Sequence, residues 1–109
     1  MLRDYKQQLD DILQAITFIR DYIQGMDYKT FEEDSKTQHA VIRNLEVIGE
    51  AARNIPDDVR KISPEIEWNK IIALRNILIH EYFGISIKIV WDVIQNKHDI
   101  LEKTCLRLL

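Results

Sequence analysis

Apolar residues recur at alternating spacings of three and four at the start of the chain, the periodicity of an amphipathic α-helix. This stripe predicts a helix from about Asp4 to Gln24, ended by Gly25. Its members are Tyr5, Leu9, Ile12, Ile16, Ile19 and Ile23. The segment 26–33 is predicted to be a connector whose aromatic residues cover one end of a helical bundle. These aromatic residues are Tyr28 and Phe31.

A second apolar stripe predicts a helix that starts at an N-cap, either Asp34 or Ser35, and runs to about Asn54. Its members are Val41, Leu45, Ile48, Ala52 and Ile55. Gly49 lies inside this helix, where glycine costs about 1 kcal/mol relative to alanine. Two explanations stay open for Gly49. It permits the close approach of another backbone or a ligand, or it is a tolerated accident.

Two further helices complete the pattern. After a short extra turn that begins at Pro56, the third helix is expected from about Trp68 to Tyr82, and Gly84 breaks it. The fourth is expected from Ser86, its N-cap, to Leu106. Its inward residues are Ile87, Val90, Trp91, Ile94 and Leu101. Because the connectors are short, the sequence predicts an all-α fold, an up-and-down four-helix bundle that forms a single domain over residues 1–109.

The third helix has two different faces. When residues are projected at about 100° each, one arc is apolar and is predicted to face the core. It holds Ile71, Leu74, Ile77 and Leu78. The opposite arc holds Arg75, Asn76 and His80, and Asn76 and His80 are neighbours one helical turn apart.

Two isoleucines, Ile72 and Ile79, lie among these polar residues, near about 60° and 40° from Arg75. A monomer would expose both to water. The pattern therefore predicts that this face is buried against a second subunit. A two-fold axis there would bring Arg75, Asn76 and His80 of both chains together.

Composition narrows the class of protein. Hydrophobic residues make up 46% of the chain and charged residues 30%, as in an ordinary globular domain. The net charge of -3 is unlike that of a general nucleic-acid binder, so RNA contacts would need a local patch. The single cysteine, Cys105, excludes an internal disulfide and is expected to fill apolar space. The charged N-terminus and the lack of a long apolar run predict a cytoplasmic protein without a membrane span.

Two blocks of sequence resemble the HepT-like group of HEPN proteins. Arg75, His80 and Tyr82 match its R-x4-H-x-Y signature, within the third-helix block WNKIIALRN and HEYF. The second-helix block AVIRNLEVIGEAA, residues 40–52, is similar too, and Val90-Trp91 follows at the usual place. The resemblance covers nearly the whole chain.

The resemblance implies a metal-independent endoribonuclease toxin that acts as a homodimer and needs no cofactor. Arg75 and His80 would form the catalytic pair, with Asn76 as the polar residue beside them. The antitoxin of this group is a small nucleotidyltransferase of the MntA type, which can transfer AMP from ATP to the motif tyrosine. Tyr82 is therefore expected to be a regulatory acceptor, although it can also simply pack beside Phe83.

Charged residues on the second helix also bear on the site. Arg43, Glu46, Glu50 and Arg53 share one strip, which is either a row of surface ion pairs or a support for Arg75 and for RNA. Arg43 and Glu46 are the candidates for that support. A di-metal bundle site needs Glu-x-x-His on two helices, and this spacing is absent from the sequence.

A second function of a different class stays open. The chain could be a non-catalytic helical partner that helps a nucleotidyltransferase bind its nucleotide or substrate. The intact Arg75, Asn76 and His80 favour the ribonuclease, and the acidic net charge mildly favours the binding module.

Overall fold

The computed structural model describes residues 5–80 and 84–109, and within these ranges every regular element is a helix. The elements are α1 Tyr5–Ile23, α2 Tyr28–Glu32, α3 Ser35–Arg53, α4 Asp57–Lys61, α5 Trp68–His80, α6 Ile87–Asn96 and α7 His98–Leu108. The predicted all-α fold is confirmed. Asp4, where the first helix was expected to begin, lies outside the described residues, as does Tyr82. None of the described helices combines the length and apolar content that a membrane crossing requires.

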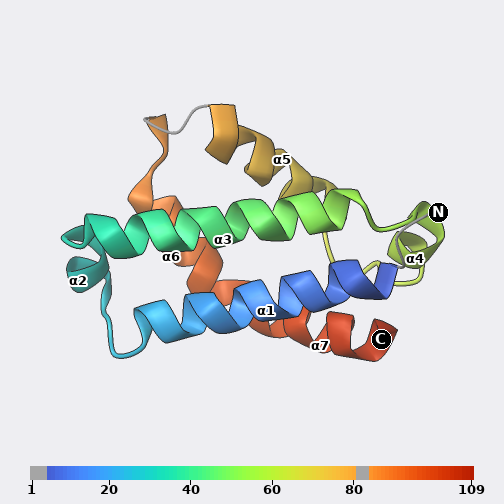
Figure 1. The fold of residues 1–109 in the computed structure, drawn as a ribbon. Coiled ribbons are helices and arrows are strands. Elements are labelled where there is room, and N and C mark those ends of the chain that lie inside the picture. Colours follow the sequence, from blue (N-terminus) through green and yellow to red (C-terminus); the bar gives the residue numbers. More distant parts are fainter. Residues whose placement is uncertain (1–4, 81–83) are drawn as a thin grey trace.

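The long helices α1 and α3 lie side by side and run in opposite directions (Figure 1). Helix α7 packs against α1, while α5 lies on the other side of α3 (Figure 1). The predicted stripes form the core between these helices. Its fully buried side chains include Leu9, Ile12, Ile16, Ile19, Val41 and Ile55. Gly25 ends α1 in the left-handed region at φ 77°, as expected for a helix C-terminus.

The predicted connector after Gly25 contains the short helix α2. The Asp27 carboxylate caps this helix by accepting a hydrogen bond from the Thr30 backbone N–H at 2.8 Å. Helix α2 places Phe31 in the core, where its ring lies 5.0 Å from the ring of Trp91 on α6. The prediction that aromatic residues close this end of the bundle is confirmed for Phe31. No helix was predicted in this connector; the structure adds the short helix α2, capped by Asp27.

The predicted fourth helix is two helices, α6 and α7, which meet at Lys97. Its N-cap is correct, since the Ser86 hydroxyl accepts from the Ile89 backbone N–H at 3.3 Å. The chain then changes direction, so that α6 contacts α2 whereas α7 follows α1 (Figure 1). Buried positions such as Ile94 and Leu101 stay seven residues apart across the break, which is two helical turns. Apolar periodicity therefore could not reveal it.

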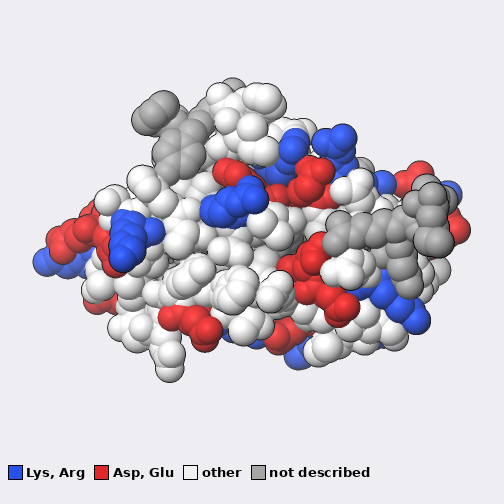
Figure 2. Space-filling model, in the orientation of Figure 1, with Lys and Arg blue, Asp and Glu red and all other residues white. Residues whose placement is uncertain are grey.

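Figure 2 shows charges of both signs on one face of the molecule. On the face shown in Figure 2, the described Lys and Arg side chains are interspersed with Asp and Glu and do not form one basic band. This distribution agrees with the net charge of -3.

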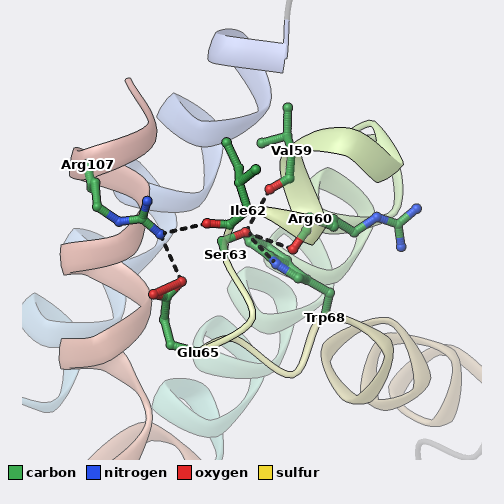
Figure 3. Close-up of polar contacts among 7 residues, drawn as sticks. All are labelled: Val59, Arg60, Ile62, Ser63, Glu65, Trp68 and Arg107. Atoms are coloured by element: carbon green, nitrogen blue, oxygen red, sulfur yellow. Dashed lines mark hydrogen bonds and ion pairs between the residues drawn. The ribbon is translucent and has the colours of Figure 1, made fainter.

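A polar network fixes the start of α5 (Figure 3). Ser63, which is fully buried, accepts a hydrogen bond from the Trp68 indole N–H at 3.0 Å and donates one to the Val59 carbonyl at 2.8 Å. From α7, Arg107 donates to the Ile62 carbonyl at 3.2 Å and to the Glu65 carboxylate at 2.8 Å. Hydrogen bonds thereby hold the loop between α4 and α5 to α4 and to α7, and this sets where α5 begins.

Candidate active site

Helix α5 packs chiefly against α3, and this determines which of its residues are covered. Leu78 is completely buried, whereas Ile77, predicted to face the core, is 47% exposed. That prediction was wrong because a single supporting helix covers a narrower arc than a complete bundle would. Ile72 is half-buried against the core, and Ile79 remains 42% exposed. The outer face of α5 thus presents Ile77 and Ile79 to solvent.

Gly49 marks the point where α5 comes closest to α3. A Cβ atom built on Gly49 would clash with the Cβ of Arg75, and would lie 2.8 Å from its Cγ and 3.2 Å from the carbonyl oxygen of Ile71. A side chain cannot fit there without moving α5. Of the two explanations for this glycine, the structure supports the close approach of another helix. The stem of Arg75 therefore rests directly on the backbone of α3.

The guanidinium of Arg75 is held from two sides. Its Nη2 lies 3.0 Å from the Glu50 carboxylate on α3, and its Nη1 donates to the Asn76 side-chain oxygen at 2.9 Å. The side chain is 20% exposed, and its buried Nε has no hydrogen-bond acceptor among the described residues. Arg75 is therefore fixed in place and keeps unused N–H donors.

Two of the other predicted residues, Asn76 and His80, lie on α5 with Arg75. Asn76, predicted beside the catalytic pair, accepts a hydrogen bond from Arg75 through its side-chain oxygen. His80 is exposed at the end of α5, one turn beyond Asn76. Tyr82, the predicted AMP acceptor, is outside the described part of the chain.

A groove of about 280 Å³ runs beside Arg75, with α3 as its floor and α1 and α5 as its sides. Its lining is Gln8, Asp11, Arg43, Glu46, Val47, Glu50, Ala51, Asn54, Arg75 and Ile79. Both Arg43 and Glu46 lie in this groove, and they approach each other to 3.5 Å. The carboxylate that pairs with Arg75 is Glu50, one turn further along, which sequence reasoning ranked lower. Its position beside Gly49 was the available signal, because the glycine marks the helix crossing.

Comparison with known sequences decides the family. A sequence model of the family described as ribonuclease HepT-like matches residues 12–108. The chain belongs to the HepT-like ribonuclease family. The resemblance inferred from the two helix blocks is thus confirmed, and so is the class of enzyme, a ribonuclease.

Relatives of this HepT-like chain are similar over nearly their full lengths. A probable ribonuclease HepT of Thermococcus cleftensis is 43% identical over 100 residues, which cover 92% of this chain and 89% of the relative. A protein of Methanocaldococcus jannaschii named as a candidate RNase is 45% identical over 102 residues, covering 92% of this chain and 84% of its own. Another protein so named, from Caldanaerobacter subterraneus, is 36% identical over 101 residues. No solved structure gives a significant match.

For a HepT-like ribonuclease, the groove is notable for its charge. Three carboxylates line it, from Asp11, Glu46 and Glu50, against the two cations Arg43 and Arg75. The groove as a whole is therefore not a positively charged phosphate-binding surface. Arg75 is the groove cation that contacts from α3 and α5 hold in one place. Within the described ranges, no three His, Cys, Asp or Glu side chains gather as a metal-binding group.

Proposed function

We propose that the chain is the endoribonuclease toxin of a toxin–antitoxin pair, and that it cuts RNA without a metal at a site completed by a second copy of the chain. The observation that carries this proposal is the clamped guanidinium of Arg75 on a helix whose outer face is exposed. His80 lies on the same helix, and Ile77 and Ile79 leave apolar area on its surface. Membership of a ribonuclease family supplies the substrate class.

RNA carries its own nucleophile, which fits a site built from arginine and histidine. The 2′-oxygen attacks the adjacent phosphorus, and the bond from phosphorus to the 5′-oxygen breaks. The products are a 2′,3′-cyclic phosphate and a free 5′-hydroxyl. One imidazole takes the proton of the 2′-hydroxyl, and another gives a proton to the leaving 5′-oxygen. The two His80 side chains of a dimer can supply both, because histidine changes charge near neutral pH.

Arg75 serves the charge that develops on the phosphoryl oxygens. A fixed guanidinium presents parallel N–H donors to two oxygens at once, and it costs no reorganisation at the moment of reaction. In this chain Glu50 and Asn76 each leave one N–H donor unused, on Nη2 and Nη1 respectively. Asn76 acts in this proposal through Arg75, which its oxygen holds.

The cleavage chemistry is tested with purified protein in the presence of EDTA. We expect cleavage of an RNA oligonucleotide, a 2′,3′-cyclic phosphate end, and no cleavage when the 2′-hydroxyl is replaced by hydrogen. The His80→Ala variant should lose at least about 100-fold in rate, the typical contribution of a general acid or base. Cleavage of the deoxy substrate, or full activity of His80→Ala, would refute this mechanism.

The composite site is tested at Ile79. A charge at an apolar position of an interface separates subunits, so Ile79→Glu should give a monomer that is inactive with every motif residue intact. The matched control is Ile100→Glu, because Ile100 is equally exposed (45%) but lies on α7. Light scattering and cleavage are measured on both variants. A monomeric Ile79→Glu protein that still cuts RNA would exclude the composite site.

Regulation through Tyr82 forms the remaining part of the proposal. The phenolic oxygen would attack the α-phosphorus of ATP, pyrophosphate would leave, and the phenol would lose its proton. The attached AMP adds bulk and negative charge two residues from His80, which would compete for Arg75. Mass spectrometry after incubation with the cognate nucleotidyltransferase and ATP tests this step. An unmodified Tyr82 would remove it from the proposal.

The excess of carboxylates in the groove favours one alternative, a helical partner that assists a nucleotidyltransferase without cutting RNA. Expression of the chain alone separates the two functions. The toxin should arrest growth, and His80→Ala should relieve the arrest. A harmless wild-type protein that leaves RNA intact would favour the binding partner.

A further inference from the structure

We infer that Glu50 is the residue that positions Arg75 for catalysis, an assignment that rests on the ribonuclease function proposed above. The R-x4-H-x-Y signature contains Arg75 and His80 but no residue of α3; Glu50 lies in the second-helix block, residues 40–52. The structure adds Glu50, because its carboxylate lies 3.0 Å from Nη2 of Arg75.

Three contacts fix Arg75 at three points along its side chain. The backbone at Gly49 meets the Cβ and Cγ atoms, Glu50 meets Nη2, and Asn76 meets Nη1. A free surface arginine loses rotamer entropy when it binds one phosphate geometry. Here most of that ordering is complete before RNA arrives.

The clamp leaves enough donors for a phosphate. A guanidinium has five N–H donors. Glu50 and Asn76 engage one each, on Nη2 and Nη1, so three remain on the three nitrogens. The Nε is buried and has no acceptor among the described residues, so the donors for a phosphate are those on Nη1 and Nη2. The charge of Glu50 opposes an incoming phosphate, so attraction for RNA does not explain the placement of this carboxylate.

A positioning role and a purely structural role of Glu50 predict different kinetics. If Glu50 aligns Arg75 with the reacting phosphate, its removal lowers kcat, while KM stays constant or falls because a negative charge is gone. If Glu50 merely stabilises the fold, removal acts through stability alone. Its side chain is 49% exposed, and ion pairs of that exposure contribute little to stability. Removing it should therefore leave the protein folded.

The experiment uses Glu50→Ala, Glu50→Gln and a matched control, Asp99→Ala. Asp99 also pairs with an arginine, at 2.8 Å from Arg20, but joins α7 to α1 and does not line the groove. Each variant is measured for melting temperature, for kcat and KM on one RNA oligonucleotide, and for the Arg75 Nε–H signal by nitrogen-15 NMR. That signal is assigned by its loss in Arg75→Lys.

We expect Glu50→Ala to lower kcat about 10- to 100-fold, the cost of a small misplacement of a catalytic group. Its KM should not rise, and its Arg75 Nε–H signal should shift and exchange faster with water. Glu50→Gln keeps an oxygen in the same place and should recover part of the rate. Asp99→Ala should match the wild type in kcat and in the NMR signal.

Two results would overturn the assignment. One is a Glu50→Ala variant with kcat within twofold of the wild type, and the other is an unchanged Arg75 Nε–H signal. If the wild-type protein cuts no RNA, the ribonuclease proposal fails by that measurement. The NMR comparison still decides whether Glu50 holds Arg75.

Discussion

Replacement of Gly49 by alanine tests the crossing of α3 and α5 directly. The added methyl group would clash with the Cβ of Arg75 and would lie 2.8 Å from its Cγ and 3.2 Å from the carbonyl oxygen of Ile71. These atoms belong to the stem of a side chain and to the backbone of α5, so no flexible end can move aside. The whole helix has to shift.

The size of the effect follows from two opposing contributions. Alanine is favoured over glycine inside a helix by about 1 kcal/mol. Overpacking of a tight contact costs about 1–3 kcal/mol, and this contact is closer than the usual separation of carbon atoms. We therefore expect Gly49→Ala to reduce the free energy of unfolding by up to about 2 kcal/mol, even though propensity alone predicts the opposite sign.

Urea denaturation of three variants measures this effect. The control is Gly84→Ala, since a Cβ there meets no atom of the described residues within 4 Å and should not lower stability. The double variant Gly49→Ala/Arg75→Gly removes the opposing Cβ, so its destabilisation should fall below the sum of the single changes by about 1 kcal/mol or more. A Gly49→Ala protein more stable than the wild type, or strict additivity, would refute the steric argument.

Three further predictions concern buried groups. Burial and the nearby Arg20 lower the pKa of His98 to about 4 in the folded protein. At pH values below the ordinary histidine pKa of 6.5, the unfolded chain therefore binds more protons than the folded protein does. Stability should fall by at most about 3 kcal/mol as pH drops from 6.5 toward 4, and urea titrations should show a flatter profile for His98→Gln. Burial raises the pKa of the Cys105 thiol to about 12, so a thiol reagent such as dithionitrobenzoate should react at neutral pH only after unfolding; rapid reaction of the native protein would contradict this. Ser63→Ala leaves the Trp68 indole N–H without its acceptor and should cost about 1–3 kcal/mol in chemical denaturation, whereas an unchanged midpoint would show that water replaces the hydroxyl.

Local patterns predicted most of the helices, because caps and apolar periodicity act over a few residues. Asp34 and Ser86 cap the helices that the sequence assigned to them. The break at Lys97 escaped, since the apolar register continues across it and neither glycine nor proline marks it. What sets the break is the different neighbours of α6 and α7, which is tertiary information.

The candidate site shows the same division. The sequence placed Arg75, Asn76 and His80 on one face of a helix, because spacing along a helix is enough for that. It could not decide which carboxylate of α3 meets Arg75, since Glu46 and Glu50 share one strip and the choice depends on where the helices cross. It also assigned Ile77 to the core, because a projection gives the direction of a side chain but not how many neighbouring helices cover it.

The support of α5 chiefly by α3 has a consequence for how the protein loses its site. A helix held along one side opens more readily than one packed between neighbours, so hydrogen exchange in α5 should be faster than in α1 or α3. Arg75 and His80 both lie on this helix. Thermal inactivation should therefore begin below the temperature at which the main core melts. A partner bound to the outer face of α5 would make the opening of α5 rarer. The temperature of inactivation would then lie closer to the temperature at which the core melts.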